Sequence, residues 1–216
     1  MSWRLVALCL AVAALAAGGM AALIALNPGG GGAPATRTAI VGSARFTLPA
    51  GYFRPQSRGG GRLERLDLAA FFPDFTPAGD NSDIDAGADL AERYQKLVFI
   101  DIRAADSSLD PADRPAKLYA RFLEADRWSH PGGLEAAGFQ AGSPFEGQEL
   151  YFVAPEGRAF AARCGRPDPA RTTPNACAYD FRVDGLDVEL RFPAALLSEW
   201  RTLNDGARGL IAAGRR

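Results

Sequence analysis

The sequence offers few residues whose chemistry could build a catalytic site, and the most site-like segment is Ser129-His130-Pro131-Gly132-Gly133. A serine–histidine pair acts as nucleophile and base only when a third group orients the imidazole and an oxyanion hole faces the serine. Residues adjacent in a chain rarely present a hydroxyl to the neighbouring imidazole, and no G-x-S-x-G motif occurs. We therefore expect a turn after a helix, in which Ser129 and His130 are candidates for ligand contact at most.

A second group of chemistry-bearing residues is acidic. Asp83, Asp85 and Asp89 follow Asp80 closely, and carboxylate oxygens on a loop are the ligands that Ca²⁺ takes. The spacing departs from the EF-hand pattern, which requires a glutamate where this chain has Tyr94. We expect a hydrated loop before a short helix, and we predict no metal site and no cofactor.

Two arginines flank the glycine run of Arg58-Gly59-Gly60-Gly61-Arg62. Backbone amides and guanidinium groups could together meet a phosphate or an anionic headgroup. The run lacks the spacing and the Lys-Ser/Thr ending of a phosphate-binding loop. A flexible hairpin tip is the expected structure, with Arg58 and Arg62 as further candidates for ligand contact.

The cysteines predict a structural bond. Cys164 and Cys177 each adjoin a run that resembles a strand, and the loop between them is rich in Pro, Gly, Thr and Asn. Two strands of a hairpin bring such positions within the reach of a disulfide, which persists in oxidising compartments. No C-x-x-C spacing is present to indicate a redox pair. Cys9 lies in an apolar run and is expected to be a small buried residue.

The composition excludes several classes of protein. The 216 residues are 48% hydrophobic and 23% charged, as in globular domains, so the chain is not wholly disordered. Lys and Arg number 24 against 25 Asp and Glu, and this balance argues against a nucleic-acid-binding protein. The single histidine excludes sites that need two.

The N-terminal residues predict a membrane anchor. Residues 5–26 carry no charge, and a helix of that length spans a hydrocarbon core of about 30 Å. Arg4 precedes the run and the next basic residue is Arg37, so the positive-inside rule places the N-terminus in the cytoplasm. The alternative is a cleaved signal peptide with Ala33-Pro34-Ala35 as its cleavage site, but its apolar region would be unusually long.

This topology gives three segments and a location. We expect a signal anchor over residues 1–26, a Gly/Pro-rich flexible tether over 27–37 and an extracytoplasmic domain over 38–216. The domain would lie in the periplasm, held to the bacterial cytoplasmic membrane by a bilayer contact through residues 5–26. Small residues at Ala14, Gly18 and Ala22 could also allow a homodimer through the membrane helix.

Alternation of apolar and polar residues predicts the strands of the domain. They are expected at residues 44–48, 61–70, 96–103, 148–153, 158–164, 177–183 and 186–192. In the clearest of them Val98, Ile100 and Ile102 point one way, while Asp101 and Arg103 point the other. The last four should form an antiparallel meander with one solvated face.

Two helices are expected beside these strands, at residues 115–125 and 193–213. The second has an apolar stripe of Leu196, Trp200, Leu203, Ala207 and Leu210, which should cover the apolar face of the meander. Gly206 and Gly209 should weaken it relative to alanine. The predicted fold class is therefore α+β, with a mostly antiparallel sheet of about six to seven strands packed by two helices.

A targeting segment without a catalytic constellation favours a non-enzymatic function. We expect a tethered binding or accessory module that meets an envelope protein, since anchoring raises effective concentration near other membrane components. Two alternatives stay open: an envelope hydrolase with an unrecognised site, and a small-ligand sensor with a pocket between sheet and helices. No nucleic-acid partner is expected.

Overall fold

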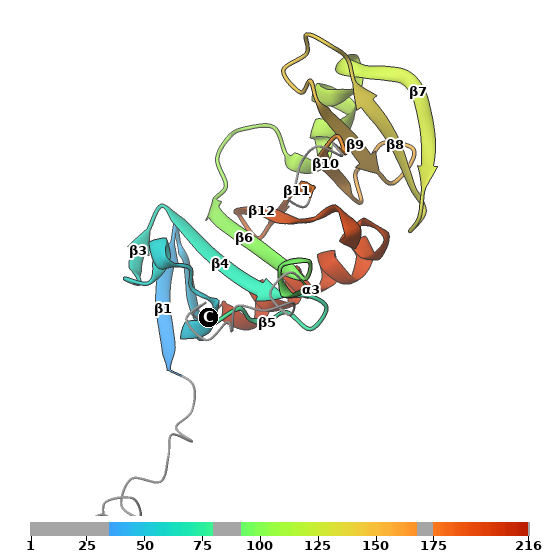
Figure 1. Ribbon diagram of the computed structural model, residues 1–216. Helices are drawn as coiled ribbons and strands as arrows, with labels where there is room; N and C mark the ends of the chain where they lie inside the picture. The colour runs from blue at the N-terminus through green and yellow to red at the C-terminus, as the bar shows by residue number, and fades with distance from the viewer. Residues whose placement is uncertain (1–34, 80–91, 168–174, 216) are drawn as a thin grey trace, which may run out of the picture. The chain divides into compact units, whose positions relative to one another are not determined.

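The computed structural model describes residues 35–79, 92–167 and 175–215, and residues Thr36–Arg216 group into one compact unit (Figure 1). The expected anchor at residues 5–26, and most of the expected tether, lie outside the described residues. Within the described ranges, no helix has both the length and the hydropathy to cross a bilayer.

The main element is a nine-stranded sheet in which every neighbouring pair is antiparallel. Its strand order is β5-β4-β6-β12-β11-β10-β9-β8-β7. The strands are β4 (Arg65–Phe71), β5 (Thr76–Pro77), β6 (Leu97–Ala104), β7 (Leu123–His130), β8 (Leu134–Phe139), β9 (Gln148–Phe152), β10 (Ala161–Gly165), β11 (Ala176–Val183) and β12 (Leu186–Pro193). The meander expected at the end of the chain is present as β9 to β12, and Asp184 and Gly185 turn the last hairpin with positive φ angles of 48° and 75°.

A second sheet of three strands has the order β2-β1-β3. Its strands are β1 (Thr36–Val41), β2 (Ala44–Pro49) and β3 (Gly61–Leu63), and the β1–β3 pair is parallel. Two 3₁₀ turns, η1 (Ala50–Tyr52) and η2 (Pro55–Ser57), lead from β2 to β3. Near the C-terminus Arg215 bridges to Phe46 on β2, so both ends of the described unit meet at this small sheet.

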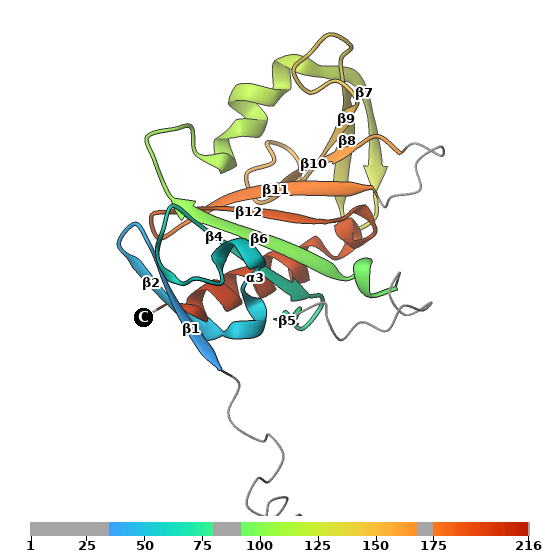
Figure 2. The same ribbon diagram turned by 60° about the vertical axis from the view of Figure 1, so that its left-hand side comes forward.

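One face of the large sheet packs on the C-terminal helix, and we call this the inner face. The helix α3 (Trp200–Gly214), preceded by the 3₁₀ turn η7 (Ala194–Glu199), runs along β4, β6, β12 and β11 (Figure 2). The expected stripe is confirmed, because all five of its residues are buried in the main core together with Ile100 and Leu190 of the sheet. The Tyr179 hydroxyl donates a 3.0 Å hydrogen bond to Asn204 on the helix.

The opposite, outer face is covered at both ends: the turns η1 and η2 lie against β4, where Ser57 bonds to Asp67, and a helical segment lies at the other end. This segment consists of the 3₁₀ helix η4 (Pro111–Asp113), which contacts β11, followed by the π-helix η5 (Pro115–Tyr119) and the 3₁₀ helix η6 (Ala120–Phe122), which lie beside β8 and β9 (Figure 2). Their Tyr119 packs with Phe139, Leu150 and Phe152 in a second apolar cluster. This segment was expected to be a helix over residues 115–125. The prediction is confirmed in part: the segment is helical, as a π-helix over Pro115–Tyr119 and a 3₁₀ helix over Ala120–Phe122, but the chain becomes extended at Leu123, before the expected end.

The strand count is also corrected. The sequence predicts about six to seven strands in one sheet, whereas the large sheet has nine and a second sheet exists beside it. Strands β7 and β8 were missed because β7 is an exposed edge strand without apolar alternation and β8 is buried on both faces. Ser129 and His130 were expected in a turn, but they end β7, and the turn begins at Pro131.

The expected disulfide is present between Cys164 on β10 and Cys177 on β11. The two residues are directly opposite in the antiparallel register, with Cα atoms 4.0 Å apart, and both are buried. The bond therefore joins neighbouring strands in the middle of the sheet and closes the loop between them.

Protein isolated from cells should contain this bond. After thiol alkylation without reductant, mass spectrometry should find Cys164 and Cys177 unmodified. The Cys164→Ala/Cys177→Ala double variant should lose about 3 kcal/mol of unfolding free energy, the stabilisation expected for a loop of this length. Alkylation of both thiols in the unreduced protein would contradict the prediction.

Two glycines of α3 should respond oppositely to alanine. A Cβ at Gly206 would lie 2.2 Å from ring atoms of buried Phe75, whereas no atom lies within 4 Å of one at Gly209. Gly206→Ala should therefore destabilise the fold by about 1–3 kcal/mol through overpacking. Gly209→Ala should stabilise it by up to about 1 kcal/mol through helix propensity. Denaturant unfolding measures both, and equal effects of the two variants would disprove the assigned packing.

Candidate functional site

The strand register places four carboxylates in one row across the outer face. Asp67 on β4 is opposite Asp101 on β6, which is opposite Glu189 on β12, which is opposite Asp180 on β11. Neighbouring strands lie about 4.8 Å apart, so these side chains stand side by side. We call these four residues the carboxylate row.

The first two members of the row form a buried carboxyl pair. Asp67 is 3% exposed and Asp101 4%. Ser57 donates to Asp67 Oδ2 at 3.2 Å, and Arg65 Nε lies 2.6 Å from Asp67 Oδ1. Arg54 Nη1 lies 3.8 Å from Asp101 Oδ1, too far for a hydrogen bond. Like charges directly opposite on a sheet are unfavourable, so the two carboxyl groups interact closely.

These surroundings change the acidity of Asp101. Burial raises the pKa of its carboxyl, and the Asp67 carboxylate on β4 raises it further. Arg65 on β4 and Arg191 on β12 act in the opposite direction without cancelling the rise. Burial likewise raises the pKa of Asp180, although Arg114 lies 2.8 Å away and opposes the shift.

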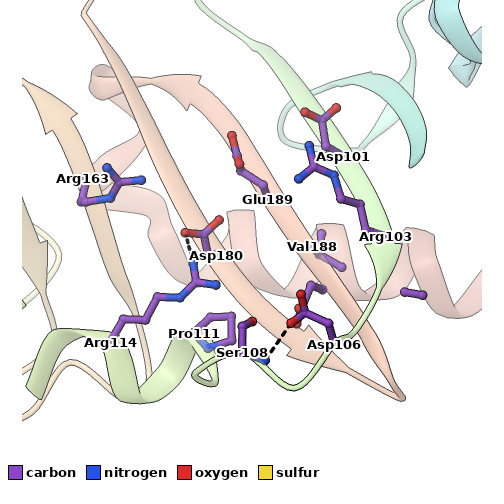
Figure 3. Close-up of a pocket in the computed structure, with 12 residues that line it drawn as sticks. Asp101, Arg103, Asp106, Ser108, Pro111, Arg114, Arg163, Asp180, Val188 and Glu189 are labelled. Carbon is purple, nitrogen blue, oxygen red and sulfur yellow. Dashed lines mark hydrogen bonds and ion pairs between the residues drawn. The ribbon is translucent and has the colours of Figure 1, made fainter. Parts of the chain in front are cut away.

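Three members of the row line a cavity of about 280 Å³, which we call the polar cavity (Figure 3). Asp101, Glu189 and Asp180 stand on its floor, on three adjacent strands. Arg114 enters it from the turns that cover the far end of the sheet, and Arg163 enters from β10. The polar cavity therefore forms where the covering segment ends and the outer face opens.

An apolar hollow adjoins the carboxylate row on the same face. Two depressions of about 470 and 280 Å³ share Arg54, Tyr94, Leu97 and Phe99, and we call them together the apolar groove. Tyr94 is 46% exposed, one of three large apolar side chains that the described residues expose. The Arg54 guanidinium stacks over the Phe99 ring at 4.6 Å. Phe99 precedes Asp101 by two residues, or about 7 Å along the strand.

Ser129 and His130 do not form a catalytic pair. Successive side chains of a strand point to opposite faces, so the hydroxyl and the imidazole diverge. The His130 ring packs on Tyr151 at 5.0 Å, and its Nδ1 lies 2.9 Å from the Pro131 carbonyl oxygen. Neither Ser129 nor His130 lines the polar cavity or the apolar groove.

The other sequence candidates are not brought together. Arg58 follows η2 and lines the apolar groove, while Arg62 on β3 donates to the Gly42 carbonyl at 3.3 Å. The run between them turns from η2 into a strand that pairs in parallel with β1, so it is not the expected hairpin tip. Asp83, Asp85 and Asp89 lie outside the described residues. Among the residues that are described, no three acidic, histidine or cysteine side chains could hold a metal ion.

The carboxylate row was missed by sequence reasoning. Alternation places Asp101 and Glu189 on the outward side of their predicted strands, and that signal was available. It does not reveal that β4, β6, β12 and β11 are neighbours, because the chain inserts five strands between β6 and β12.

The fold of this chain is shared by a solved structure. No family model and no curated protein matches it. One similar solved structure is Smlt3025, an immunity protein of the Stenotrophomonas maltophilia type IV secretion system. The two share 17% identity with a TM-score of 0.59 over 85% of this chain and 94% of that one. Another is the Neisseria meningitidis iron-regulated outer membrane lipoprotein FrpD, at 12% identity and a TM-score of 0.48 over 83% and 92%. The alignment with Smlt3025 shows a shared fold.

The Asp101 carboxyl should make stability depend on pH. Its unfolded pKa is about 3.9 and its folded pKa is higher, so the folded state binds more protons between these values. The stability that the raised pKa of Asp101 contributes is fully present below about pH 3.9, and it is lost as the pH rises through the folded pKa. Asp101→Asn should therefore raise the melting temperature relative to the parent at pH 7 but not at pH 4.

Asp126→Asn, at an exposed position on β7, is the control and should leave the difference between pH 4 and pH 7 unchanged. An Asp101→Asn variant with the same stability deficit at both pH values would overturn the assignment.

Proposed function

We propose that this chain is an anchored accessory module of the bacterial envelope that works by binding a protein partner through the outer face of its large sheet. The observation that carries the proposal is the apolar groove. It places exposed Tyr94 beside Leu97, Phe99 and Arg54 on a face that α3 does not cover. Aromatic side chains and arginines are the residues enriched in protein interfaces.

The envelope location rests on two features of the chain. The charge-free run at residues 5–26 is long enough for a membrane anchor. The buried Cys164–Cys177 disulfide is typical of proteins in oxidising compartments. These features support a periplasmic domain tethered to the cytoplasmic membrane.

The fold indicates which partner to test first. Smlt3025, whose fold this chain shares, is an immunity protein of a secretion system. We therefore propose a secreted effector as the first partner to examine. An envelope hydrolase is the less favoured function, because Ser129 and His130 point to opposite faces of β7.

Site-specific photo-crosslinking in intact cells tests the surface whichever protein binds there. A benzophenone amino acid at Tyr94 should give a defined crosslinked species, since a side chain in the groove would touch the bound protein. The same amino acid at Trp128, 39% exposed at the far edge of the sheet, is the matched control and should not give that species. With the purified partner, Tyr94→Ala should weaken binding by about ten-fold or more, as for a central interface aromatic.

A crosslink at Trp128 and none at Tyr94 would move the binding surface to the β7 edge and refute the groove. Identical products from both positions, or none from either, would also count against the proposal.

A further inference from the structure

The charged residues that line the apolar groove all have the same sign. They are Arg54, Arg58 and Arg191, and no described carboxylate lines either of the two depressions. The polar cavity on the same face differs, because carboxylates make up most of its charged lining. Like charges around an apolar hollow reinforce one another, so the apolar groove should attract a negatively charged group.

Arg54 lines both depressions and keeps its hydrogen-bond donors available. Its guanidinium stacks over the Phe99 ring at 4.6 Å, which stabilises the cation without a carboxylate. Asp101 Oδ1 lies 3.8 Å from Arg54 Nη1, beyond hydrogen-bond distance, and no described residue accepts a hydrogen bond from this guanidinium. Since the side chain is 30% exposed, its N–H donors remain available to an acceptor in the groove.

Arg191 adds to the positive charge from β12. Its Nε atom lies 2.5 Å from Glu189, and this ion pair reduces its contribution, so Arg54 is the residue on which the inference depends. Between the two arginines the lining of the smaller depression is mostly apolar, with Leu97, Phe99, Phe192 and Pro193. The site therefore combines an apolar hollow with an arginine whose hydrogen-bond donors have no acceptor in the described chain.

We propose that the segment of the partner protein that enters the apolar groove is acidic, with an aspartate or glutamate next to a large apolar side chain, and that Arg54 binds the carboxylate. The inference rests on the proposed function and deepens it, because it names the chemistry of the partner at the same groove. An arginine–carboxylate pair is stronger than a neutral hydrogen bond. A basic segment would be repelled by the same arginines, and a purely apolar group would leave the Arg54 donors unsatisfied.

Three short peptides test this charge preference on the full-length chain in phosphatidylcholine nanodiscs. They are N-acetyl-Asp-(4-fluoro-Phe)-amide, its neutral isostere with Asn, and its basic analogue with Lys. Fluorine relaxation of each peptide reports binding, with empty nanodiscs as the blank. The aspartate peptide should bind about five-fold more tightly than the asparagine peptide, and the lysine peptide should bind most weakly.

Variants of Arg54 should change this preference. Arg54→Gln should abolish the preference for aspartate over asparagine, whereas Arg54→Lys keeps the charge and should retain part of it. Arg121→Gln is the matched control, because Arg121 likewise stacks over a phenylalanine ring, that of Phe122 at 4.9 Å, but does not line the groove. It should leave the preference unchanged. Comparing the peptides within one variant separates a lost charge contact from a general loss of stability.

Three results would refute the inference. These are equal affinities for the aspartate and asparagine peptides, a preference for the lysine peptide, and an aspartate preference that survives in Arg54→Gln. Failure of all three peptides to bind the parent chain would also refute it, since the groove would then not take the apolar side chain.

The inference and the proposed function fail separately. A defined crosslink at Tyr94 without an aspartate preference would keep the protein partner and remove its acidic segment. A preference that depends on Arg54 without a crosslink in cells would refute the protein partner and leave a groove that selects acidic apolar groups.

Discussion

The packing of α3 on one face of the large sheet is the constraint on which the rest of the structure depends. In β6 the side chains of Ile100 and Ile102 are fully buried against the helix, and the alternation of a strand then forces Asp101 and Arg103 to the other face. A shift of one residue in register would exchange the two sets, so burial of the stripe on α3 also fixes where the charges emerge.

The outer face exposes charged and apolar side chains because no segment covers all of it. The turns from Pro111 to Phe122 bury an aromatic cluster over β8 to β10 and then stop. Beyond them the outward carboxylates of the sheet are neighboured by arginines, Asp180 by Arg114 and Glu189 by Arg191, and Asp67 is bonded to Ser57 of η2. Charge and apolar surface therefore meet on one exposed area, a combination found in protein interfaces.

The sequence predicted the elements in which buried side chains recur at a regular spacing. Alternation located the meander, and the stripe of α3 identified the helix and the face that it covers. It failed at β7, because the exposed residues of that strand show no apolar alternation. At residues 115–125 it located a helical segment but not its π and 3₁₀ geometry or its end at Phe122. The carboxylate row depends on strand order, which is decided by contacts between distant segments and not by local pattern.

The meeting of both ends of the described unit at the small sheet has a consequence for the history of such domains. Strand β1 opens the unit, and Arg215 closes it beside Phe46 on the neighbouring strand. A module with adjacent ends is easily transplanted, because it can be inserted into a loop of a host protein or joined to a different leader without rearranging its interior. Evolution could thus join this domain to unrelated leader segments or host proteins. The domain and the segment fused to it would then have separate ancestries.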